Sequence, residues 1–258
     1  MLKAPGQQIS LTDPDARSMK SRGAGVVGYN VQTAVDTKHH MIVAHEVTNQ
    51  GSDRRQLANM AKQAKSVLAT EALTAVADRG CYRSEDIQEC ERANITSYLP
   101  KPNTSGNRAK GQFGRDAFHY IAEDDEYECP AGQRLIHRMT TQERGKTLHR
   151  YWATVCQQCP LKAKCTSGKE RRIARWEHEE VLEAAQARLD RNPDMMRIRR
   201  ATVEHPAEPS QYRRSGEVAQ ATLHALYDAN PKRRYMVVPN QEEAGWPIFI
   251  CKEKAAPF

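Results

Sequence analysis

One acidic residue of this sequence stands where it could hold a metal ion. The segment Leu73–Tyr82, LTAVADRGCY, is an apolar, β-prone run that ends at Asp78, and Gly80 helps to break the strand just after it. A carboxylate at the carboxyl end of a core strand is well placed to bind a divalent cation at the rim of an α/β sheet. The alternative is that Asp78 only caps the next turn or helix, since strand–Asp–Gly–helix units are common.

Two further acids extend this hypothesis. Asp36 ends another predicted strand, and Glu204 lies late in a predicted helix. Phosphodiester cleavage and strand transfer are well served by two divalent ions ~3.5–4 Å apart, one activating the attacking oxygen and the other stabilising the leaving oxygen. Carboxylates distant in sequence usually hold such ions, but spacing alone does not distinguish these three acids among thirty-two acidic residues.

Four of the seven cysteines form a second motif: Cys129 in YECPAG, then Cys156, Cys159 and Cys165 in CQQCPLKAKC. Thiolates at C-x2-C spacing suit tetrahedral Zn²⁺, and a closed four-sulfur site would pin a long polar connection. An iron–sulfur cluster and reduced free thiols are the alternatives, and the spacing favours zinc. The start of the sequence has no apolar signal core, which favours metal ligands over disulfides.

The composition indicates a polar, intracellular globular protein that binds a polyanion. Charged residues make up 28% of the 258 residues and aromatic residues 6%, and no apolar run approaches the ~20 residues of a membrane span. Residues 133–176 carry eleven Lys and Arg against two Glu, a local excess above the net charge of +7 for the whole chain. We expect this basic block to contact DNA, unless it is only a solvated loop.

The elements that would position these residues alternate between strands and helices. The pattern predicts strands over 25–36 and 41–48, a helix over 53–68 that Asp53 caps, a strand over 73–78, a helix over 84–93 and a strand over 95–99. Helices follow over 176–190 and 194–204. Two antiparallel strands leading into a helix-linked strand predict a mixed sheet with flanking helices.

The residues in these elements resemble a known family. GYNVQTAVDTKHHMIVAHEVTNQGSDRRQL, VADRGCYRSEDI and VEHP are similar to the DDE transposases of the IS1182 group, within the IS4/IS5 superfamily, and the likeness runs from about Ile9 to Pro206. It includes the SLTDPDAR opening and the cysteine insertion. The resemblance implies an RNase H-like catalytic core that cuts and rejoins DNA with Mg²⁺ or Mn²⁺.

Carried over residue by residue, the resemblance assigns Asp78 as the second catalytic acid and Glu204 as the glutamate, both ligands of the catalytic metal. It assigns Arg200, four residues before Glu204, to a DNA phosphate. Two positions depart from the family's Y-R-E-K signature: Arg197 stands in place of the tyrosine and Gln211 in place of the lysine.

The first acid of the family is not found at its usual place. It lies in a DGT-like strand upstream of the TDPDAR segment, and this sequence begins only a few residues before that segment's Thr12. Asp36 and Asp13 are weak candidates to replace it, and Asp36 is more simply interpreted as a turn residue. The expectation from the resemblance is therefore an N-terminally truncated, incomplete and inactive copy.

The last part of the sequence changes character near Ala207. Ser215–Ile248 resembles the end of some short-chain dehydrogenases, without that family's cofactor loop or catalytic pair. We expect four regions: the first part of an RNase H-like core over 1–118, a basic four-cysteine zinc insertion over 119–175, the helical end of the core over 176–206, and an unrelated, poorly docked tail over 207–258.

The function predicted from the sequence is DNA transposition in the cytoplasm. The predicted partners are double-stranded DNA, as transposon ends and target, and an intact transposase in a homo-oligomer; the predicted cofactors are catalytic Mg²⁺ or Mn²⁺ and structural Zn²⁺. The alternative from another class is a noncatalytic zinc-containing DNA-binding remnant. An oxidoreductase is suggested by the tail alone.

Overall fold

The computed structural model describes residues 13–21, 24–38, 41–103, 106–204 and 248–254. The chain divides into two compact units, unit 1 formed by residues 1–102 and 181–258 and unit 2 formed by residues 103–180. No helix in the described ranges is both long enough and apolar enough to cross a membrane.

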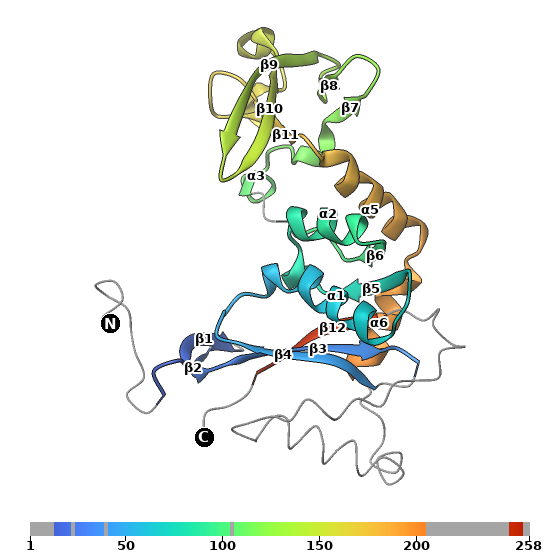
Figure 1. The fold of residues 1–258 in the computed structure, drawn as a ribbon. Helices are drawn as coiled ribbons and strands as arrows, with labels where there is room; N and C mark the ends of the chain where they lie inside the picture. The colour runs from blue at the N-terminus through green and yellow to red at the C-terminus, as the bar shows by residue number, and fades with distance from the viewer. Residues whose placement is uncertain (1–12, 22–23, 39–40, 104–105, 205–247, 255–258) are drawn as a thin grey trace. The chain divides into compact units, whose positions relative to one another are not determined.

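Unit 1 is built on a five-stranded mixed sheet (Figure 1). Its strands lie in the order β4-β3-β12-β5-β6. Their bounds are β3 Asn30–Asp36, β4 Ile42–Thr48, β5 Leu73–Ala77, β6 Ile95–Tyr98 and β12 Ile248–Lys254. β3 pairs antiparallel with β4 and with β12, whereas β5 pairs parallel with β6 and with β12.

The predicted strands and helices of unit 1 are present, with small shifts at their ends. The helices are α1 Leu57–Val67, α2 Ser84–Arg92, α5 Glu179–Arg191 and α6 Asp194–Glu204, with short 3₁₀ turns η1 Asp53–Arg55 and η2 Arg79–Cys81. α1 buries Leu57, Met60, Ala61 and Ala64, the apolar stripe that the sequence predicts. The predicted strand over 25–36 is interrupted at Tyr29: β2 Ala24–Gly28 pairs with β1 Arg17–Ser21, and only β3 joins the main sheet.

Two expectations for unit 1 were wrong. Residues 248–254, expected to lie in a poorly docked tail, form β12 in the middle of the sheet, and Ile250 is fully buried there. Asp53 is not the cap of its helical segment, because the Ser52 side chain accepts the hydrogen bond from the Arg54 backbone N–H instead. The rest of the predicted tail, and the VEHP residues after Glu204, lie outside the described residues.

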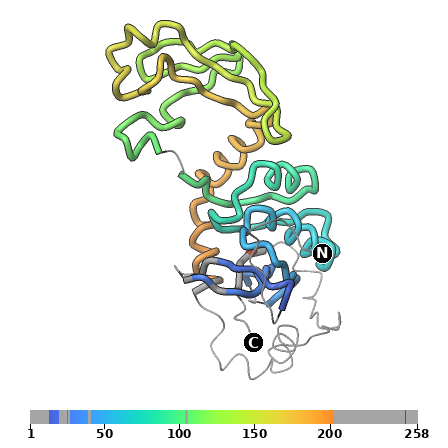
Figure 2. The backbone as a smooth tube through the Cα atoms, turned by 90° about the vertical axis from the view of Figure 1, so that its left-hand side faces the viewer, coloured from blue at the N-terminus to red at the C-terminus, as the bar shows by residue number. Residues whose placement is uncertain are grey.

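Unit 2 contains an antiparallel five-stranded sheet that curls on itself (Figure 2). Its strand order is β11-β10-β9-β8-β7, with bounds β7 His119–Ile121, β8 Glu126–Glu128, β9 Arg134–Glu143, β10 Lys146–Trp152 and β11 Ile173–Trp176. Arg144 and Gly145 both have positive φ angles and join β9 to β10 in a two-residue turn. Shorter pieces complete the unit: α3 Gly106–Ala109, η3 Arg115–Ala117, η4 Thr154–Gln158 and α4 Lys162–Cys165.

The core of unit 2 is aromatic and lies against the cysteines. Phe118, Tyr127, Leu135, Tyr151 and Ile173 are buried together, and Cys129, Cys156 and Cys165 pack at their edge. The Asp125 carboxylate accepts hydrogen bonds from the hydroxyls of Tyr120 (2.8 Å) and Tyr151 (2.7 Å). The insertion that the sequence presented as a cysteine motif is therefore a small folded sheet with its own core.

Candidate active site

Asp78 lies at the carboxyl end of β5, as the sequence predicts. The strand before it is buried, with Ala75, Val76 and Ala77 fully enclosed. Oδ1 of Asp78 accepts a hydrogen bond from the Gly80 backbone N–H and caps η2. Oδ2 lies 3.6 Å from Nη1 of Arg199, and the Asp78 side chain is 52% exposed. Capping and ligand roles are therefore compatible, because the cap uses one oxygen while the carboxylate stays accessible to solvent.

Helix α6, which carries Glu204, packs against β5. Met195 and Met196 in its first turn lie against the buried cluster that contains Val76, and Arg199 one turn later reaches Asp78. The helix thus follows the direction of β5 and passes its carboxyl end. Glu204 ends α6 and stands five residues after Arg199, about 7.5 Å along the helix axis. The structure brings the helix to the strand; it does not describe the Glu204 side chain.

The arginine that contacts Asp78 is not the one taken from the resemblance. Arg200 is exposed, and its assignment to a DNA phosphate stays a prediction. Arg199, its neighbour, is the residue within ion-pair distance of Asp78. Sequence reasoning missed Arg199 because only the fold shows which face of α6 lies against β5.

The two weak candidates for a first acid lie in other surroundings. Asp36 is buried at the end of β3, where its carboxylate accepts the Lys38 backbone N–H and closes the turn toward β4. Ile248 of β12 pairs with Asp36 on one side and with Ala75 on the other. Asp36 is therefore level with Ala75, three residues before Asp78, and β3 lies two strands away from β5. These separations amount to ~10 Å in each direction, too far for a shared ion.

Asp13 is held in a turn before β1. Its carboxylate accepts the Tyr29 hydroxyl at 3.0 and 2.9 Å and the backbone N–H groups of Asp15 and Ala16. The hydrogen bond from Tyr29 is the largest influence that lowers the pKa of Asp13 below its ordinary value. The interactions of Asp13 are those of a structural turn residue.

Asp53 is a carboxylate close to Asp78 that the sequence reasoning did not select. A Cβ placed on Gly80 would lie 2.8 Å from Oδ1 of Asp78 and 3.7 Å from Oδ2 of Asp53, so both carboxylates face the same glycine. Oδ1 of Asp53 accepts hydrogen bonds from the side-chain amides of Asn30 and Gln32, each at 3.0 Å. The signal in the sequence is NVQ at the start of β3, where polar side chains recur every second residue in a buried strand.

The thiol beside this pair is not suited to be a nucleophile. Cys81 follows Gly80 and is buried, and burial, reinforced by the charges of Asp78 and Asp53, raises its pKa to about 12. A nucleophilic cysteine needs a thiolate at working pH, and Cys81 stays protonated. Cys90, in α2, is fully buried, and burial raises its pKa to about 12 as well.

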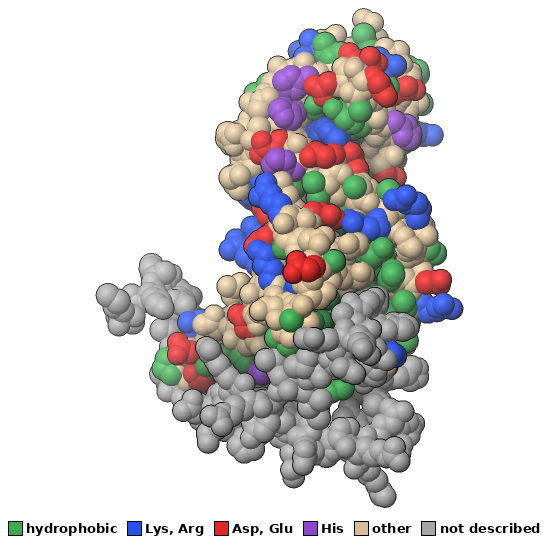
Figure 3. All heavy atoms as spheres, turned by 45° about the vertical axis from the view of Figure 1, so that its right-hand side comes forward, with side chains coloured by type: hydrophobic (Ala, Val, Ile, Leu, Met, Phe, Trp, Pro, Cys, Tyr) green, Lys and Arg blue, Asp and Glu red, His purple; other side chains and the backbone are tan. Residues whose placement is uncertain are grey.

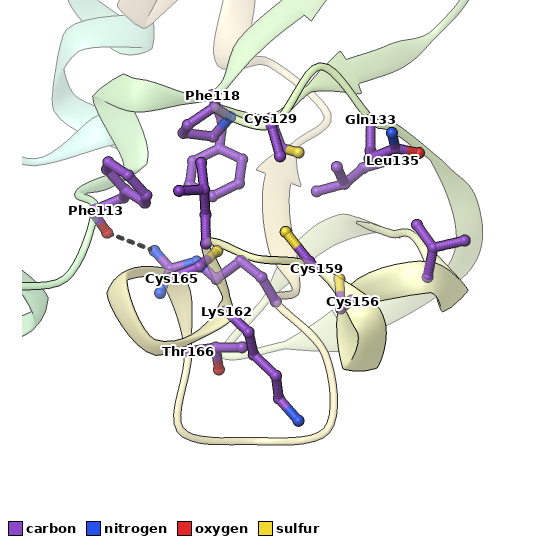
Figure 4. A pocket seen from close by; sticks show the side chains of 15 residues that line it. Phe113, Phe118, Cys129, Gln133, Leu135, Cys156, Cys159, Lys162, Cys165 and Thr166 are labelled. Carbon is purple, nitrogen blue, oxygen red and sulfur yellow. Dashed lines mark hydrogen bonds between the residues drawn. The ribbon is translucent and has the colours of Figure 1, made fainter.

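The four clustered cysteines of unit 2 line one cavity (Figure 4). Cys129 follows β8, Cys156 lies in η4, Cys159 ends that turn and Cys165 ends α4. The cavity has a volume of about 30 Å³, and its other walls include Phe113, Phe118 and Leu135. Burial raises the pKa of Cys165, and the three other thiols act in the same direction, whereas Arg171 opposes them.

The four cysteines line one cavity, but their side chains are not arranged to coordinate a metal ion. Across the described ranges, no three His, Cys, Asp or Glu side chains lie close enough together to hold one metal ion. The expected zinc site is therefore not present as coordination geometry. The fold nevertheless brings together all four residues of the motif, although Cys129 and Cys156 are far apart in the chain.

The basic block of unit 2 is only partly available to a polyanion. Arg175 is buried with its guanidinium 3.7 Å from the centre of the Tyr120 ring, and Arg150 pairs with Glu143. Arg138, Arg144 and Lys164 are exposed. Figure 3 shows basic and acidic side chains interspersed on the face that it presents, rather than one uniform basic surface.

A mixed α/β sheet with a carboxylate at the end of a core strand, flanked by a helix that carries a glutamate, is consistent with a DDE-type, RNase H-like catalytic domain. Residues 1–206 match the family model described as "Transposase DDE domain", and the chain belongs to this family. Membership implies a role in DNA transposition, DNA as a partner and divalent metal ions as cofactors. No similarity to a curated protein or to a solved structure was found.

Proposed function

We propose that the site at the carboxyl end of β5 performs metal-dependent cleavage and transfer of DNA strands, with Asp78 and Glu204 as metal ligands. The observation that carries the proposal is the packing of α6 against β5, which brings Arg199 to 3.6 Å from Asp78 on the helix that ends at Glu204. Mg²⁺ or Mn²⁺ bound there would supply Lewis acidity toward a phosphodiester.

Asp78 and Arg199 would have different roles at this site. Asp78 offers a half-exposed carboxylate held in place by the Gly80 backbone N–H, so that it is fixed before a metal ion arrives. Arg199 balances the charge of Asp78 in the absence of a cation and is near enough to contact a DNA phosphate in its presence. Within the family, the IS1182 group remains the assignment that the sequence motifs support, with transposon ends and target DNA as the substrates.

A cleavage assay on plasmid DNA that carries the transposon ends tests the proposal. The full chain is incubated with Mn²⁺ or Mg²⁺, alongside Asp78→Ala, Glu204→Gln and the control Asp36→Asn, which keeps an oxygen to accept the Lys38 N–H. Nicking that requires metal and disappears in the first two variants supports the proposal. Nicking that persists in Asp78→Ala refutes it. Metal-dependent nicking by the unmodified chain would also contradict the expectation from the sequence that this copy is inactive.

The second candidate is a noncatalytic, zinc-containing DNA-binding protein. The observation that favours it is the shared cavity of Cys129, Cys156, Cys159 and Cys165, because thiolates are ligands that Zn²⁺ prefers. Zinc binding would have to draw these side chains closer together than they lie in the structure. This candidate predicts one zinc per chain, reduced in Cys159→Ser, and DNA affinity that falls steeply with salt and ignores Mg²⁺. Binding of this kind without any cleavage favours the second candidate over the first. A chain purified without zinc that still binds DNA excludes a role for zinc.

A further inference from the structure

The Asp53 carboxylate belongs to a larger hydrogen-bond network than a turn residue needs. Asn30 and Gln32 are both fully buried on β3, and each donates a side-chain N–H to Oδ1 of Asp53. Gln32 also donates to Oδ1 of Asn30, and Asn30 to the Gln50 carbonyl. Burying two side-chain amides in β3, an interior strand of the sheet, is costly unless their hydrogen bonds are made. The network thus fixes the orientation of one carboxylate.

The fixed orientation turns the second oxygen of Asp53 toward Asp78. Oδ1 accepts hydrogen bonds from the two amides, and Oδ2 lies 3.7 Å from a Cβ placed on Gly80. The same Cβ would lie 2.8 Å from Oδ1 of Asp78. Since both distances are measured from one point, the two carboxylate oxygens are separated by no more than their sum, 3.7 and 2.8 Å. A Cβ at position 80 would lie 2.8 Å from Oδ1 of Asp78, so the Asp78 carboxylate would have to shift if Gly80 were replaced.

The strand register places this network at the same end of the sheet as Asp78. Ile250 of β12 is paired with both Ala77 and Ala34, so Thr33 is level with Asp78. Gln32 and Asn30 therefore lie just beyond the carboxyl end of β5. Asp36, on the same strand, lies toward the other end.

The amide network around Asp53 contains an oxygen without a hydrogen-bond partner among the described residues. Oε1 of Gln32 is buried and accepts no hydrogen bond from any described residue, although Nε2 of the same amide contacts Asp53. Exchanging the amide oxygen and nitrogen would set the oxygen against the Asp53 carboxylate and lose both donated bonds, so the orientation is determined by the network. A buried amide oxygen without a donor is uncommon, and it is a hard-cation ligand.

We propose that Asp53 and Asp78 together bind the divalent cation of this site, with Gln32 Oε1 as a neutral oxygen ligand or as an acceptor for a metal-bound water. This inference rests on the proposed function for the role of Asp78, and it assigns the second carboxylate to Asp53 instead of Asp36 or Asp13. Mg²⁺ is commonly held by one or two carboxylates, several waters and substrate phosphates, so two acids suffice.

Charge supports the pairing. Two carboxylates around one glycine repel each other, and a nearby cation reduces this repulsion. Arg199 lies 3.6 Å from Oδ2 of Asp78. A divalent ion between the two carboxylates would relieve this repulsion.

Titration of Mn²⁺ into the full chain, followed by calorimetry, tests the inference without requiring activity. The variants are Asp53→Asn, Asp78→Asn and the control Asp36→Asn, the same change on β3 at the other end of the sheet. We expect the first two to weaken Mn²⁺ binding at least tenfold and the control to stay within twofold of the unmodified chain, with Mg²⁺ competing for the same site.

The outcomes separate this inference from the proposed function. Weakening by Asp78→Asn with no change in Asp53→Asn overturns the inference and leaves Asp78 as a ligand. No change in either variant, or no Mn²⁺ binding at all, overturns both. If Asp53→Asn does not fold, Gln32→Glu replaces it: a third carboxylate should make the thermal stabilisation by Mn²⁺ larger than in the unmodified chain. An equal or smaller stabilisation contradicts the inference.

Discussion

Replacing Ile250 by alanine tests whether β12 is the central strand beside the candidate site. Ile250 is fully buried, and its partners in the neighbouring strands are Ala34 and Ala77, also fully buried. The methyl side chains of these alanines cannot rotate into the space that the lost carbons leave. The cost should therefore fall toward the upper part of the ~2–5 kcal/mol seen for such truncations, about 4 kcal/mol.

The assay is thermal and urea unfolding followed by circular dichroism, with Val47→Ala as the control. Val47 lies on β4 of the same sheet and is 48% exposed, so its truncation should change stability by about 0.5 kcal/mol or less. A loss of about 4 kcal/mol corresponds to a fall in Tm of roughly 8–16 °C for a unit of this size. Equal effects of the two variants would refute the placement of β12.

Three other predictions concern individual side chains. Arg199→Ala should change stability by less than about 1 kcal/mol, because its ion pair with Asp78 is partly exposed, and should tighten Mn²⁺ binding in calorimetry by removing a competing cation; weaker binding contradicts this. Burial acts to raise the pKa of Asp125, but hydrogen bonds from Tyr151 and Tyr120 outweigh it and hold that pKa below its usual value. Asp125 therefore adds stability above roughly pH 4 that is lost as the pH falls through its lowered pKa, and Asp125→Asn should flatten the acid limb of a stability–pH curve. Cys81 and Cys90, whose pKa values burial raises to about 12, should resist iodoacetamide at pH 8 in the folded chain and react in urea, as mass spectrometry of the labelled peptides would show.

The sequence predicted the local elements of unit 1 better than their assembly. Alternation and apolar stripes located β4, α1, β5, α2, β6 and α6 within a few residues, because each buries one face that its own residues encode. The pairing of β12 with β3 and β5 is a long-range contact, and no local pattern in residues 248–254 marks it as a central strand. The sheet of unit 2 was not predicted, because the cysteine motif is a stronger signal than the short alternation around Tyr127, Leu135 and Tyr151.

The candidate site shows the same division between local and long-range information. Asp78 was predictable because its strand, its turn and its glycine are consecutive, so one short segment carries the whole signal. The second carboxylate was not, since Asp53 stands before a helical segment and looks like a cap. Only the folded sheet shows that two buried amides of β3 orient it toward Gly80.

The cost of those buried amides is the strongest physical argument about where a cation would bind. Asn30 and Gln32 give up hydration in the interior of a sheet. Both donate to a single carboxylate, and Gln32 also donates to Asn30. Valine or alanine at both positions would pack as well in a strand and would demand no partners. Polar side chains at these positions make physical sense if the orientation of Asp53 matters. Oδ2 of Asp53, which faces Gly80, is the atom that the proposed metal ion would contact.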